Sequence, residues 1–365
     1  MKAFLGLILT MLSCCTYTLH AQSDEQRLFA PGDYGSRNWR IPAVRCLADS
    51  SILIVNDMRK FNEGDLPEDI DVVCRRSTDG GRTWSEPLTI VRGTGVGQGY
   101  GDPALVETRS GEVLCAFAGG NGLWASTLEN PQSIYICRST DHGQNWSAPE
   151  NITAIVWGPT ANNPADNPSC KPYEGGFIAS GNGLLLTHGP NAGRILFAAA
   201  LCRSHNTLDN FVLYSDDDGH TWHVSDLAYA NGDEAKLVEL NDGRLLMSVR
   251  QQGARGYAIS HDSGQTWGEQ GHWPEMATNA CNGDLIRYND TTLLHSLPNS
   301  MERENLSLFF SRDEGKTWGN PVTICAGGSA YSSLTLLPDG SIGIYYEKET
   351  PQGYELWFKK MKSPL

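Results

Sequence analysis

The chain of 365 residues has few positive charges, no C-x-x-C pair of cysteines and no long apolar run beyond its N-terminus. Its 28 Lys and Arg residues face 42 Asp and Glu residues, which gives a formal net charge of −14. Nucleic-acid-binding proteins normally carry a basic surplus that meets the phosphates, so this balance argues against a nucleic-acid partner. An anionic ligand would have to meet positive side chains that are gathered locally.

None of the ten cysteines belongs to a C-x-x-C pair, which argues against a zinc ribbon or a redox-active dithiol. Cys14 and Cys15 lie in the N-terminal leader, and many of the other eight lie within apolar runs. We therefore expect buried free thiols. One or two disulfides are the alternative if the protein resides in an oxidising compartment.

Residues 1–21 have the features of a secretory signal peptide. Met1 and Lys2 precede an apolar run over 3–12, and small and polar residues lead to Ala21, after which we expect cleavage. The run is too short to span a bilayer, and no later segment is apolar enough for a transmembrane helix. We expect a secreted or periplasmic protein with one domain over 22–365. Lipidation at Cys14 is the less favoured alternative.

An octet of the form S-x-D-x-G-x-T-W occurs five times along the chain, with Asn replacing Thr in the second copy. The copies begin at Ser77, Ser139, Ser215, Ser260 and Ser311. Asp and Ser side chains hold turns by binding nearby backbone N–H groups, glycine supplies a positive φ, and tryptophan packs between strands. Apolar, strand-like runs such as 134–136 and 211–213 precede the octets. The octet therefore predicts a structural hairpin repeat without a catalytic role.

No long amphipathic helix stands out in the sequence. The 39 glycines indicate many tight turns, and Asn-Asp-Gly and Pro-Asp-Gly turns between the octets indicate further hairpins. We predict an all-β fold, a six-bladed β-propeller of four-stranded antiparallel blades with about 57 residues in each blade.

Together with Trp39-Arg40-Ile41-Pro42, the five octets resemble the sialidases (exo-α-neuraminidases) of bacteria and animals. The octets match the Asp boxes of that family. The segment at 40–42 matches its Phe/Tyr-Arg-Ile-Pro motif, with Trp39 as the aromatic residue. The resemblance covers residues 36 to about 362 and implies a single catalytic propeller that acts on sialylated glycans. It implies no metal or organic cofactor.

The resemblance implies three arginines that hold the carboxylate of a sialic acid. A planar, bidentate donor suits a carboxylate, so arginine is preferred over lysine. The matching residues are Arg40, Arg250 at the end of the run 245–249, and Arg303. Glu347, after the run 344–346, matches the carboxylate that holds the first arginine.

A tyrosine nucleophile is implied as well. Sialic acid carries a carboxylate on its anomeric carbon, which would repel an attacking carboxylate, whereas a neutral phenol avoids that repulsion. Tyr331 matches this nucleophile, and Glu234 matches the base that a phenol with a pKa near 10 needs beside it. Asp233 is the weaker candidate for the base, because adjacent strand residues face opposite ways.

The general acid of the family matches Asp65, with Asp69 and Asp71 as minor alternatives. We expect Asp65 on a mobile loop, where a raised pKa would help it hold a proton near neutrality. The glycine-rich segment 93–99 is expected to form a flexible loop near the mouth of the site.

Three further residues match the family less specifically and complete the implied site. Arg59 matches an arginine near O4 of the sugar, and Asp102 matches the Asp on the O4 and N-acetyl side. Trp124 is expected either to wall the acetyl pocket or to lie in the core.

These residues predict a retaining exo-α-sialidase that hydrolyses terminal sialic acids through a tyrosyl-enzyme intermediate. A trans-sialidase or an intramolecular trans-sialidase would use the same residues and differ only in the acceptor. A non-catalytic sialic-acid-binding propeller is the alternative from another class, and the presence of Tyr331 and Asp65 argues against it.

Overall fold

The computed structural model describes residues 25–127, 129–156, 173–204 and 206–362, and these are built almost entirely of β-strands, as predicted. The helical elements within these ranges are α1 (Thr153–Val156) and two 3-10 turns at Asp33–Gly35 and Leu123–Ala125. No helix in the described part has the length and apolarity of a membrane span. The predicted signal peptide lies outside the described residues.

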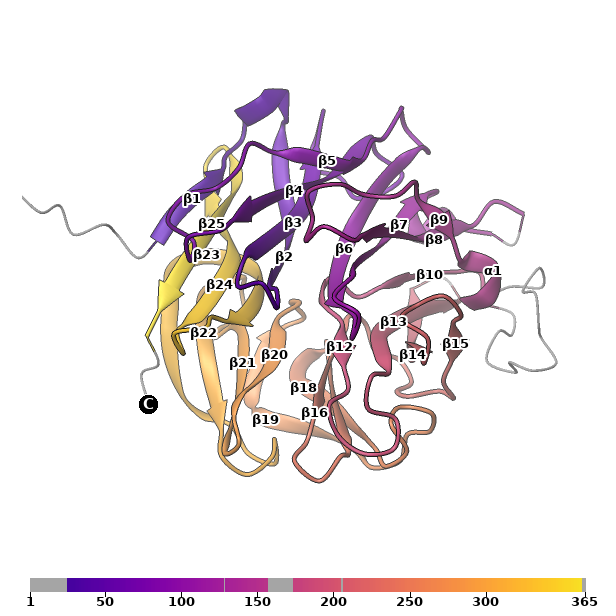
Figure 1. Ribbon diagram of the computed structural model, residues 1–365, viewed down its shortest axis with the longest axis vertical. Helices are drawn as coiled ribbons and strands as arrows, with labels where there is room; N and C mark the ends of the chain where they lie inside the picture. Colours follow the sequence, from indigo (N-terminus) through magenta and orange to yellow (C-terminus); the bar gives the residue numbers. More distant parts are fainter. Residues whose placement is uncertain (1–24, 128, 157–172, 205, 363–365) are drawn as a thin grey trace, which may run out of the picture.

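Four sheets follow one another along the chain and around the molecule (Figure 1). The first contains β2 (Asn38–Cys46), β3 (Ile52–Arg59), β4 (Ile70–Ser77) and β5 (Leu88–Val91). The second contains β6 (Gly99–Glu107), β7 (Val113–Gly120), β8 (Gln132–Ser139), β9 (Glu150–Asn151) and β11 (Gly181–Asn182). The third contains β10 (Gly175–Ile178), β12 (Leu184–Leu185), β13 (Ile195–Ser204), β14 (Thr207–Ser215) and β15 (His223–Val224). The fourth contains β16 (Ala235–Glu239), β17 (Leu245–Val249), β18 (Gln252–Ser260) and β19 (Gln270–Asn279).

The fifth sheet has seven strands because one long strand belongs to two hairpin systems. It contains β20 (Asp284–Asn289), β21 (Thr292–Pro298), β22 (Glu304–Ser311), β23 (Gly319–Leu336), β24 (Ile342–Thr350), β25 (Gly353–Met361) and β1 (Glu25–Phe29). The first part of β23 pairs with β22 and its last part with β24, while β1 pairs with β25. The structure thus brings the first and last described strands together, indigo beside yellow in Figure 1.

Antiparallel pairing, as expected, holds for the strand pairs described with one exception. β11 pairs with β6 in parallel, through the contacts of 181 with 104 and of 182 with 105. The expectation of purely antiparallel sheets is wrong at this point, because the chain that leaves β10 crosses to the second sheet before it returns to the third.

The five octets lie between the third and fourth strands of successive hairpin systems, where they form turns held by their own side chains. In the first copy, Ser77 Oγ accepts a hydrogen bond from the backbone N–H of Gly81 at 2.9 Å and donates to Asp79 Oδ1 at 2.9 Å. Asp79 also accepts bonds from the N–H and hydroxyl of Thr83. The other four copies repeat this pattern, with Asn145 in place of Thr in the second. The structural role predicted for the octet is confirmed.

The hydrophobic core lies between neighbouring sheets, which explains why many strands are apolar on both faces. Val55 and Val72 of the first sheet share one cluster with Leu105 and Phe117 of the second, and Trp146 of an octet packs against it. Each octet tryptophan joins a cluster of this kind. Of the eight cysteines outside the leader, the seven in described segments are free thiols, and all but the half-buried Cys46 are buried; Cys170 lies outside the described residues.

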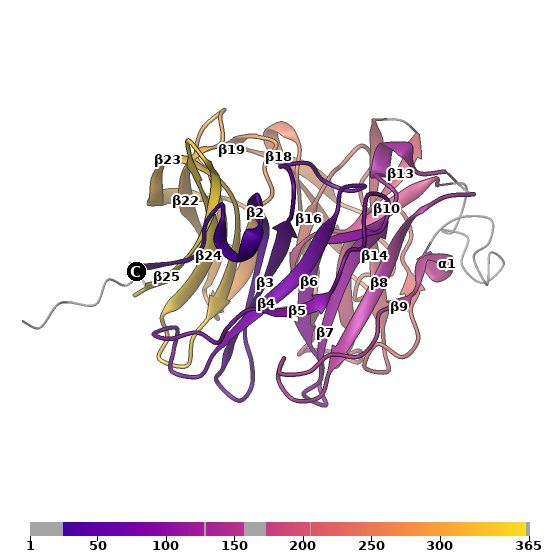
Figure 2. The same cartoon turned by 90° about the horizontal axis from the view of Figure 1, so that it is seen from above.

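The inner strands lead to two different cavities. On β2, Arg40 lines one cavity and Arg45, five residues later, lines the other, which corresponds to about 16 Å along an extended strand. The segment 233–239, which contains β16 (Ala235–Glu239), and the end of β23 are divided between the two cavities in the same order. Figure 2 shows the strands crossing the thickness of the molecule, so the cavities lie towards opposite ends of its central axis.

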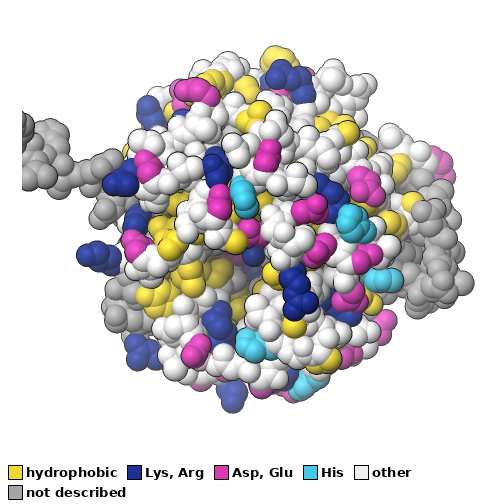
Figure 3. Space-filling view, viewed as in Figure 1, with side chains coloured by type: hydrophobic (Ala, Val, Ile, Leu, Met, Phe, Trp, Pro, Cys, Tyr) yellow, Lys and Arg dark blue, Asp and Glu magenta, His cyan; other side chains and the backbone are white. Residues whose placement is uncertain are grey.

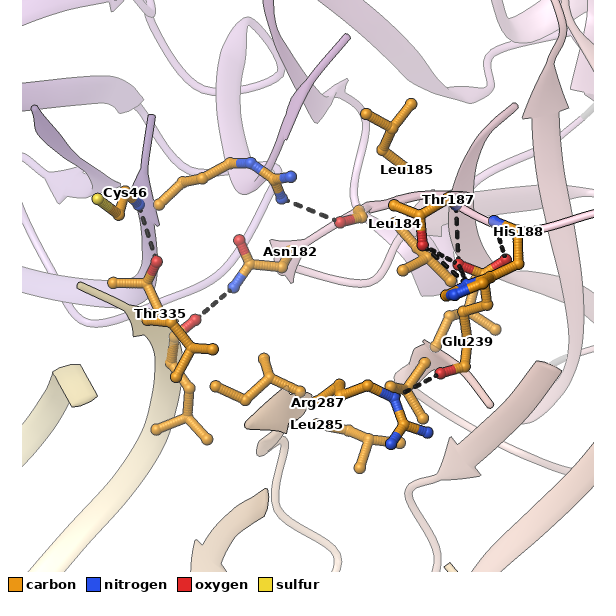
Figure 4. A pocket seen from close by; sticks show the side chains of 17 residues that line it. Cys46, Asn182, Leu184, Leu185, Thr187, His188, Glu239, Leu285, Arg287 and Thr335 are labelled. Carbon is orange, nitrogen blue, oxygen red and sulfur yellow. Dashed lines mark hydrogen bonds and ion pairs between the residues drawn. The ribbon is translucent and has the colours of Figure 1, made fainter. Parts of the chain in front are cut away.

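The cavity beside Arg45, here called the far-end cavity, has a volume of about 340 Å³ and a largely aliphatic wall (Figure 4). Its carboxylate Glu239 already accepts bonds from the backbone N–H and hydroxyl of Thr187 and from the N–H of His188. Arg287 is paired with Glu314 at 2.7 Å. The charged groups of this cavity are therefore engaged mainly by their own neighbours.

Candidate active site

Two backbone bulges shape the entrance to the cavity at the other end of the axis, here called the site cavity. The pairing of β2 with β3 shifts between 40 and 43, and that of β6 with β7 shifts between 101 and 104. Inside the bulges, Ile41 and Asp102 have φ values of 63° and 58°, and a proline follows each of them. Such left-handed backbone is unfavourable for a β-branched residue, and bulges of this kind re-aim side chains next to functional sites.

Glu347 links two separate strands of the site. It is fully buried, and its carboxylate accepts Arg40 Nε at 2.6 Å and Arg40 Nη2 at 3.2 Å. The same carboxylate accepts the backbone N–H groups of Ile41 and Tyr331. Burial alone would raise the pKa of Glu347, but Arg40 and these donors hold it below its ordinary value.

Three guanidinium groups from distant parts of the chain surround one phenol ring. The Cζ atoms of Arg40, Arg250 and Arg303 lie 5.4, 6.0 and 5.5 Å from the centre of the Tyr331 ring. Arg40 lies on β2, Arg250 directly after β17, and Arg303 directly before β22. Among the described residues, Arg303 makes no ion pair. Sequence reasoning selected these three arginines, and the structure brings them to one cavity.

The phenol oxygen of Tyr331 lies between a donor and an acceptor. It donates to Glu234 Oε2 at 2.5 Å and accepts a bond from Arg250 Nη1 at 2.7 Å. Arg250 Nη1 also contacts the same Glu234 oxygen. Burial, together with the nearby Glu234 carboxylate, raises the pKa of Tyr331 well above its ordinary value, although Arg250 opposes this. The geometry presents a neutral phenol whose proton points at a carboxylate.

Asp233 contradicts the expected strand alternation. β16 begins only at Ala235, so neither Asp233 nor Glu234 is constrained to alternate. Asp233 Oδ2 lies 3.3 Å from Arg250 Nε, and both carboxylates line the cavity. The phenol contacts Glu234, however, so the preference for Glu234 rests on contact and not on the direction of the strand.

Asp65 lies at the rim of the cavity with 78% of its side chain exposed, and its Oδ1 is 2.5 Å from Arg59 Nη2. Desolvation would raise the pKa of Asp65, but Arg59, Arg40 and Arg250 hold it below its ordinary value. The raised pKa that would help an acid is therefore not found in the site without substrate, because Arg59 first and the other two arginines stabilise the ionised form.

The minor candidates for the acid, Asp69 and Asp71, are both engaged elsewhere. Each lies 2.8 Å from Lys60 Nζ, and neither lines the cavity. The glycine-rich segment expected at the mouth packs beside the Asp65 loop, where the N–H of Gly97 donates to the carbonyl of Pro67 at 2.6 Å. A side chain at Gly99 would collide with the backbone of Glu68, so glycine is required there.

Behind Asp65 lies a buried group that sequence reasoning missed. Asp57 is two residues before Arg59 on β3, so their side chains share one face and pair at 3.1 Å. Burial raises the pKa of Asp57 to about 7, and burial with Asp57 nearby raises that of Asp102 well above its ordinary value. Arg59 is only 2% exposed, and it lies behind the wall formed by Asp65 and Asp102 rather than in it. The i, i+2 spacing of Asp57 and Arg59 was the available signal.

Trp124 stands on one side of the cavity with Leu123, Phe177 and Leu208. It is 48% exposed, so the alternative that placed it in the core is wrong. This apolar side faces the charged side formed by the three arginines. The whole cavity has a volume of about 420 Å³, within the range of small-molecule sites. In the described ranges, no three potential metal ligands gather in one place.

Comparison with known proteins agrees with this arrangement. The family described as a BNR repeat-like domain matches residues 60–344. The sialidase of Micromonospora viridifaciens is 31% identical over 350 residues, which cover 89% of this chain and 52% of that protein. The sialidase of Bacteroides fragilis is 31% identical over 347 residues, which cover 87% of this chain and 61% of that protein.

A solved structure, the Hadza microbial sialidase Hz136, superimposes with a TM-score of 0.80 at 27% identity and covers 93% of this chain and 68% of that one. The chain spans between about half and three fifths of the length of the two curated relatives. The repeats and the cavity define a protein of the BNR-repeat class. The chain belongs to the sialidase family.

Proposed function

We propose that this protein is a retaining exo-sialidase that removes terminal sialic acid from glycoconjugates. The observation that carries the proposal is the convergence of Arg40, Arg250 and Arg303 on the Tyr331 ring, with Glu234 bound to the phenol. Three cations around one phenol suit a substrate whose reacting carbon carries a carboxylate. Arg303, without an ion pair in the described part of the chain, is the most available of the three.

The first step forms a bond between the Tyr331 oxygen and the anomeric carbon while the bond from that carbon to the leaving oxygen breaks. The phenol proton passes to Glu234 along the existing hydrogen bond, and Asp65 gives its proton to the leaving oxygen. In the second step, water attacks the anomeric carbon and the bond from that carbon to the Tyr331 oxygen breaks. Asp65 takes a proton from the water, and Glu234 returns its proton to the phenol oxygen. The sugar leaves with retained configuration.

Substrate binding raises the pKa of Asp65, which is low in the free protein, and so allows Asp65 to hold a proton. The arginines lower the pKa of Asp65, and a bound sialic acid carboxylate would offset their charge. The pKa of Asp65 therefore rises when substrate occupies the site. This coupling makes the acid competent only in the presence of the correct anionic group.

The remaining lining suits the other substituents of the sugar. Asp102 faces the cavity with Arg59 behind it, on the side assigned to O4. Trp124, Leu123 and Phe177 offer an apolar surface for the methyl group of the N-acetyl substituent.

We also interpret the fold as six blades. The seven-stranded sheet divides at β23 into one four-stranded set with β20 to β22 and another with β24, β25 and β1. With the four other sheets this makes six, in the circular order of Figure 1. A propeller closed by its first and last strands protects its sheet edges.

The proposed partners are sialylated glycoproteins, glycolipids and oligosaccharides. We propose that the protein binds them outside the cytoplasm, after the signal peptide at 1–21 has been removed. The face seen in Figure 3 is hollowed near its centre and carries acidic and basic side chains interspersed. The local group of arginines can serve an anionic ligand despite the net charge, because salt screens distant charges over about 8 Å.

The test is the release of free sialic acid from a sialylated oligosaccharide, followed by mass spectrometry of the product. Wild type should give free sialic acid. A trans-sialidase would give a transferred product instead, and a binding protein would give no product.

Tyr331→Phe should lower kcat on the order of 10³-fold or more, because the nucleophile is lost. Tyr345→Phe is the matched control, since Tyr345 is equally buried but binds Asn56 away from the cavity. Equal turnover by wild type and Tyr331→Phe would refute the assignment.

A further inference from the structure

The two oxygens of the Glu234 carboxylate have different partners. Oε2 accepts bonds from the Tyr331 hydroxyl at 2.5 Å and from Arg250. Oε1 accepts a bond from Asn282 Nδ2 at 2.9 Å. Ser180 Oγ accepts from the same Nδ2 at 3.0 Å and lies 3.4 Å from Oε1. The carboxylate is divided into one oxygen that faces the phenol and one that is anchored.

The carboxylate also decides how the amide of Asn282 is oriented. Its Nδ2 points to Glu234 and Ser180, whereas its Oδ1 is buried and has no hydrogen-bond partner among the described residues. Turning the amide over would place Oδ1 against the Glu234 oxygen, so that two acceptors would face each other. It is unfavourable to leave Oδ1 buried without a partner. The bonds that Nδ2 donates to Glu234 and Ser180 therefore explain why an amide occupies this position.

This anchor belongs to a buried polar column between the two cavities. Ser180, Glu234 and Asn282 are each at most 2% exposed. One level deeper, Lys236 Nζ donates to the carbonyl of Ser180, and Asn182 Nδ2 donates to Asp284 at 2.8 Å. Each member of the upper level lies two residues before a member of the lower level, at 180 and 182, 234 and 236, and 282 and 284. The bond from Lys236 to the Ser180 carbonyl connects this lower level to the anchor.

We propose that Asn282 is a positioning residue that anchors Glu234 Oε1 and thereby aims Oε2 at the Tyr331 hydroxyl. The inference rests on the proposed function of Glu234 as the base. An ionised carboxylate in a buried place needs donors on both oxygens, and the side chain that supplies one to Oε1 at short distance is Asn282. Asn282 touches neither the phenol nor the cavity.

The inference is tested by the pH dependence of kcat in two variants with opposite expected shifts. Asn282→Ala removes the donor, so Glu234 takes up a proton more readily and the acid limb should move to higher pH by about one unit. Asn282→Asp pairs two carboxylates that share one proton, and this shared proton replaces the amide donor. When it leaves, the two charges repel each other, so the basic limb should move to lower pH.

Asn182→Ala is the matched control, because Asn182 lies in the same column and binds Asp284 instead of Glu234. It should lower the melting temperature without moving either limb. A merely structural role for Asn282 would likewise leave both limbs in place, and that result would overturn the inference.

The titration of Glu234 can also be followed without turnover. The carboxyl carbon of Glu234 is observed by NMR in protein labelled with carbon-13 glutamate, and its signal is identified by its loss in Glu234→Gln. Its titration should move to higher pH in Asn282→Ala and stay in place in Asn182→Ala. An unmoved signal in Asn282→Ala would overturn the inference even if wild type released sialic acid. A moved signal would uphold the positioning role even if it released none.

Discussion

The same inner strands end in two cavities of similar size with opposite chemistry. The site cavity receives Glu234, directly before β16, and the far-end cavity receives Leu237 of β16. On β23 the two cavities receive Tyr331 and Leu334. At the site cavity, charged groups from three sheets converge on one phenol. At the far-end cavity, the charged groups are bound mainly to their immediate neighbours and the wall is aliphatic.

This difference shows that the fold alone does not create the function. A ring of sheets forms a cavity at each end of its axis, and the register of the strands decides which side chains each cavity receives. The bulges at 40–43 and 101–104 are found only on the site side of β2 and β6, where they aim side chains into the site cavity. The function is therefore expected at one end only.

The largest difference between the two ends is expected when one carboxyl group is changed at each of them. Asp65→Asn removes the proposed acid and should lower kcat on a natural sialoside by about 10²- to 10⁴-fold. Glu239→Gln, in the far-end cavity, should change kcat by no more than a few-fold, because the Glu239 carboxylate is bound to Thr187 and His188, away from the site cavity. Comparable losses in the two variants would remove the distinction between the two ends.

The pH profile sharpens the same comparison. The acid must be protonated, and the pKa of Asp65 is lowered in the free protein, so kcat/KM should fall as pH rises through this lowered pKa, below the ordinary carboxyl range. In the complex, the substrate carboxylate offsets the positive charge of the arginines and so raises the pKa of Asp65. The basic limb of kcat should therefore lie at higher pH than that of kcat/KM. Steady-state rates across pH measure both limbs. Coincident limbs would contradict the coupling between substrate charge and Asp65.

A smaller effect is expected for one arginine at each end. Arg303→Lys loses a planar fork for the substrate carboxylate and should lower kcat/KM by about 10- to 100-fold, since each charge-assisted bond contributes roughly 1.5–3 kcal/mol. Arg45→Lys should leave kcat/KM within about twofold, because Arg45 lies in the far-end cavity. If both variants lost activity equally, the arginines would act through the fold and not through the substrate.

The smallest effect is expected in the octets, which belong to neither cavity. Asp141→Ala removes bonds to Asn145 and Ser139 and should lower the free energy of unfolding by about 1 kcal/mol, as loss of a capping side chain does, with kcat unchanged. Bonds from Asn145 lower the pKa of Asp141 to about 2. The stabilisation is therefore present above about pH 4 and is lost as pH falls towards 2. Denaturant titrations at pH 7 and pH 3 measure the difference, and an equal loss at both would contradict the assignment.

Much of the fold was predictable from local patterns, and much of the site from the resemblance to a known family. The octets carry their own turn chemistry, so their structural role followed from Ser, Asp and Gly at fixed spacing. The three arginines were found through the resemblance to the sialidases, at the positions that match those of the family. The distances between them depend on the order of the sheets around the axis, which no local pattern contains.

The errors arose where burial or pairing across the chain decides the outcome. The pKa of Asp65 depends on Arg40, Arg59 and Arg250, which only the folded chain brings near it. The alternation argument for Asp233 failed because β16 begins two residues later. The parallel pairing of β11 with β6 depends on where the chain crosses between sheets, which the sequence does not mark.

The most direct test of the account is a crystal structure of the protein with sialic acid bound. We predict that the sugar carboxylate lies within hydrogen-bond distance of Arg40, Arg250 and Arg303. The anomeric carbon should lie about 3–3.5 Å from the Tyr331 oxygen. Sialic acid in the far-end cavity, or in the site cavity with its carboxylate turned away from the three arginines, would contradict the account.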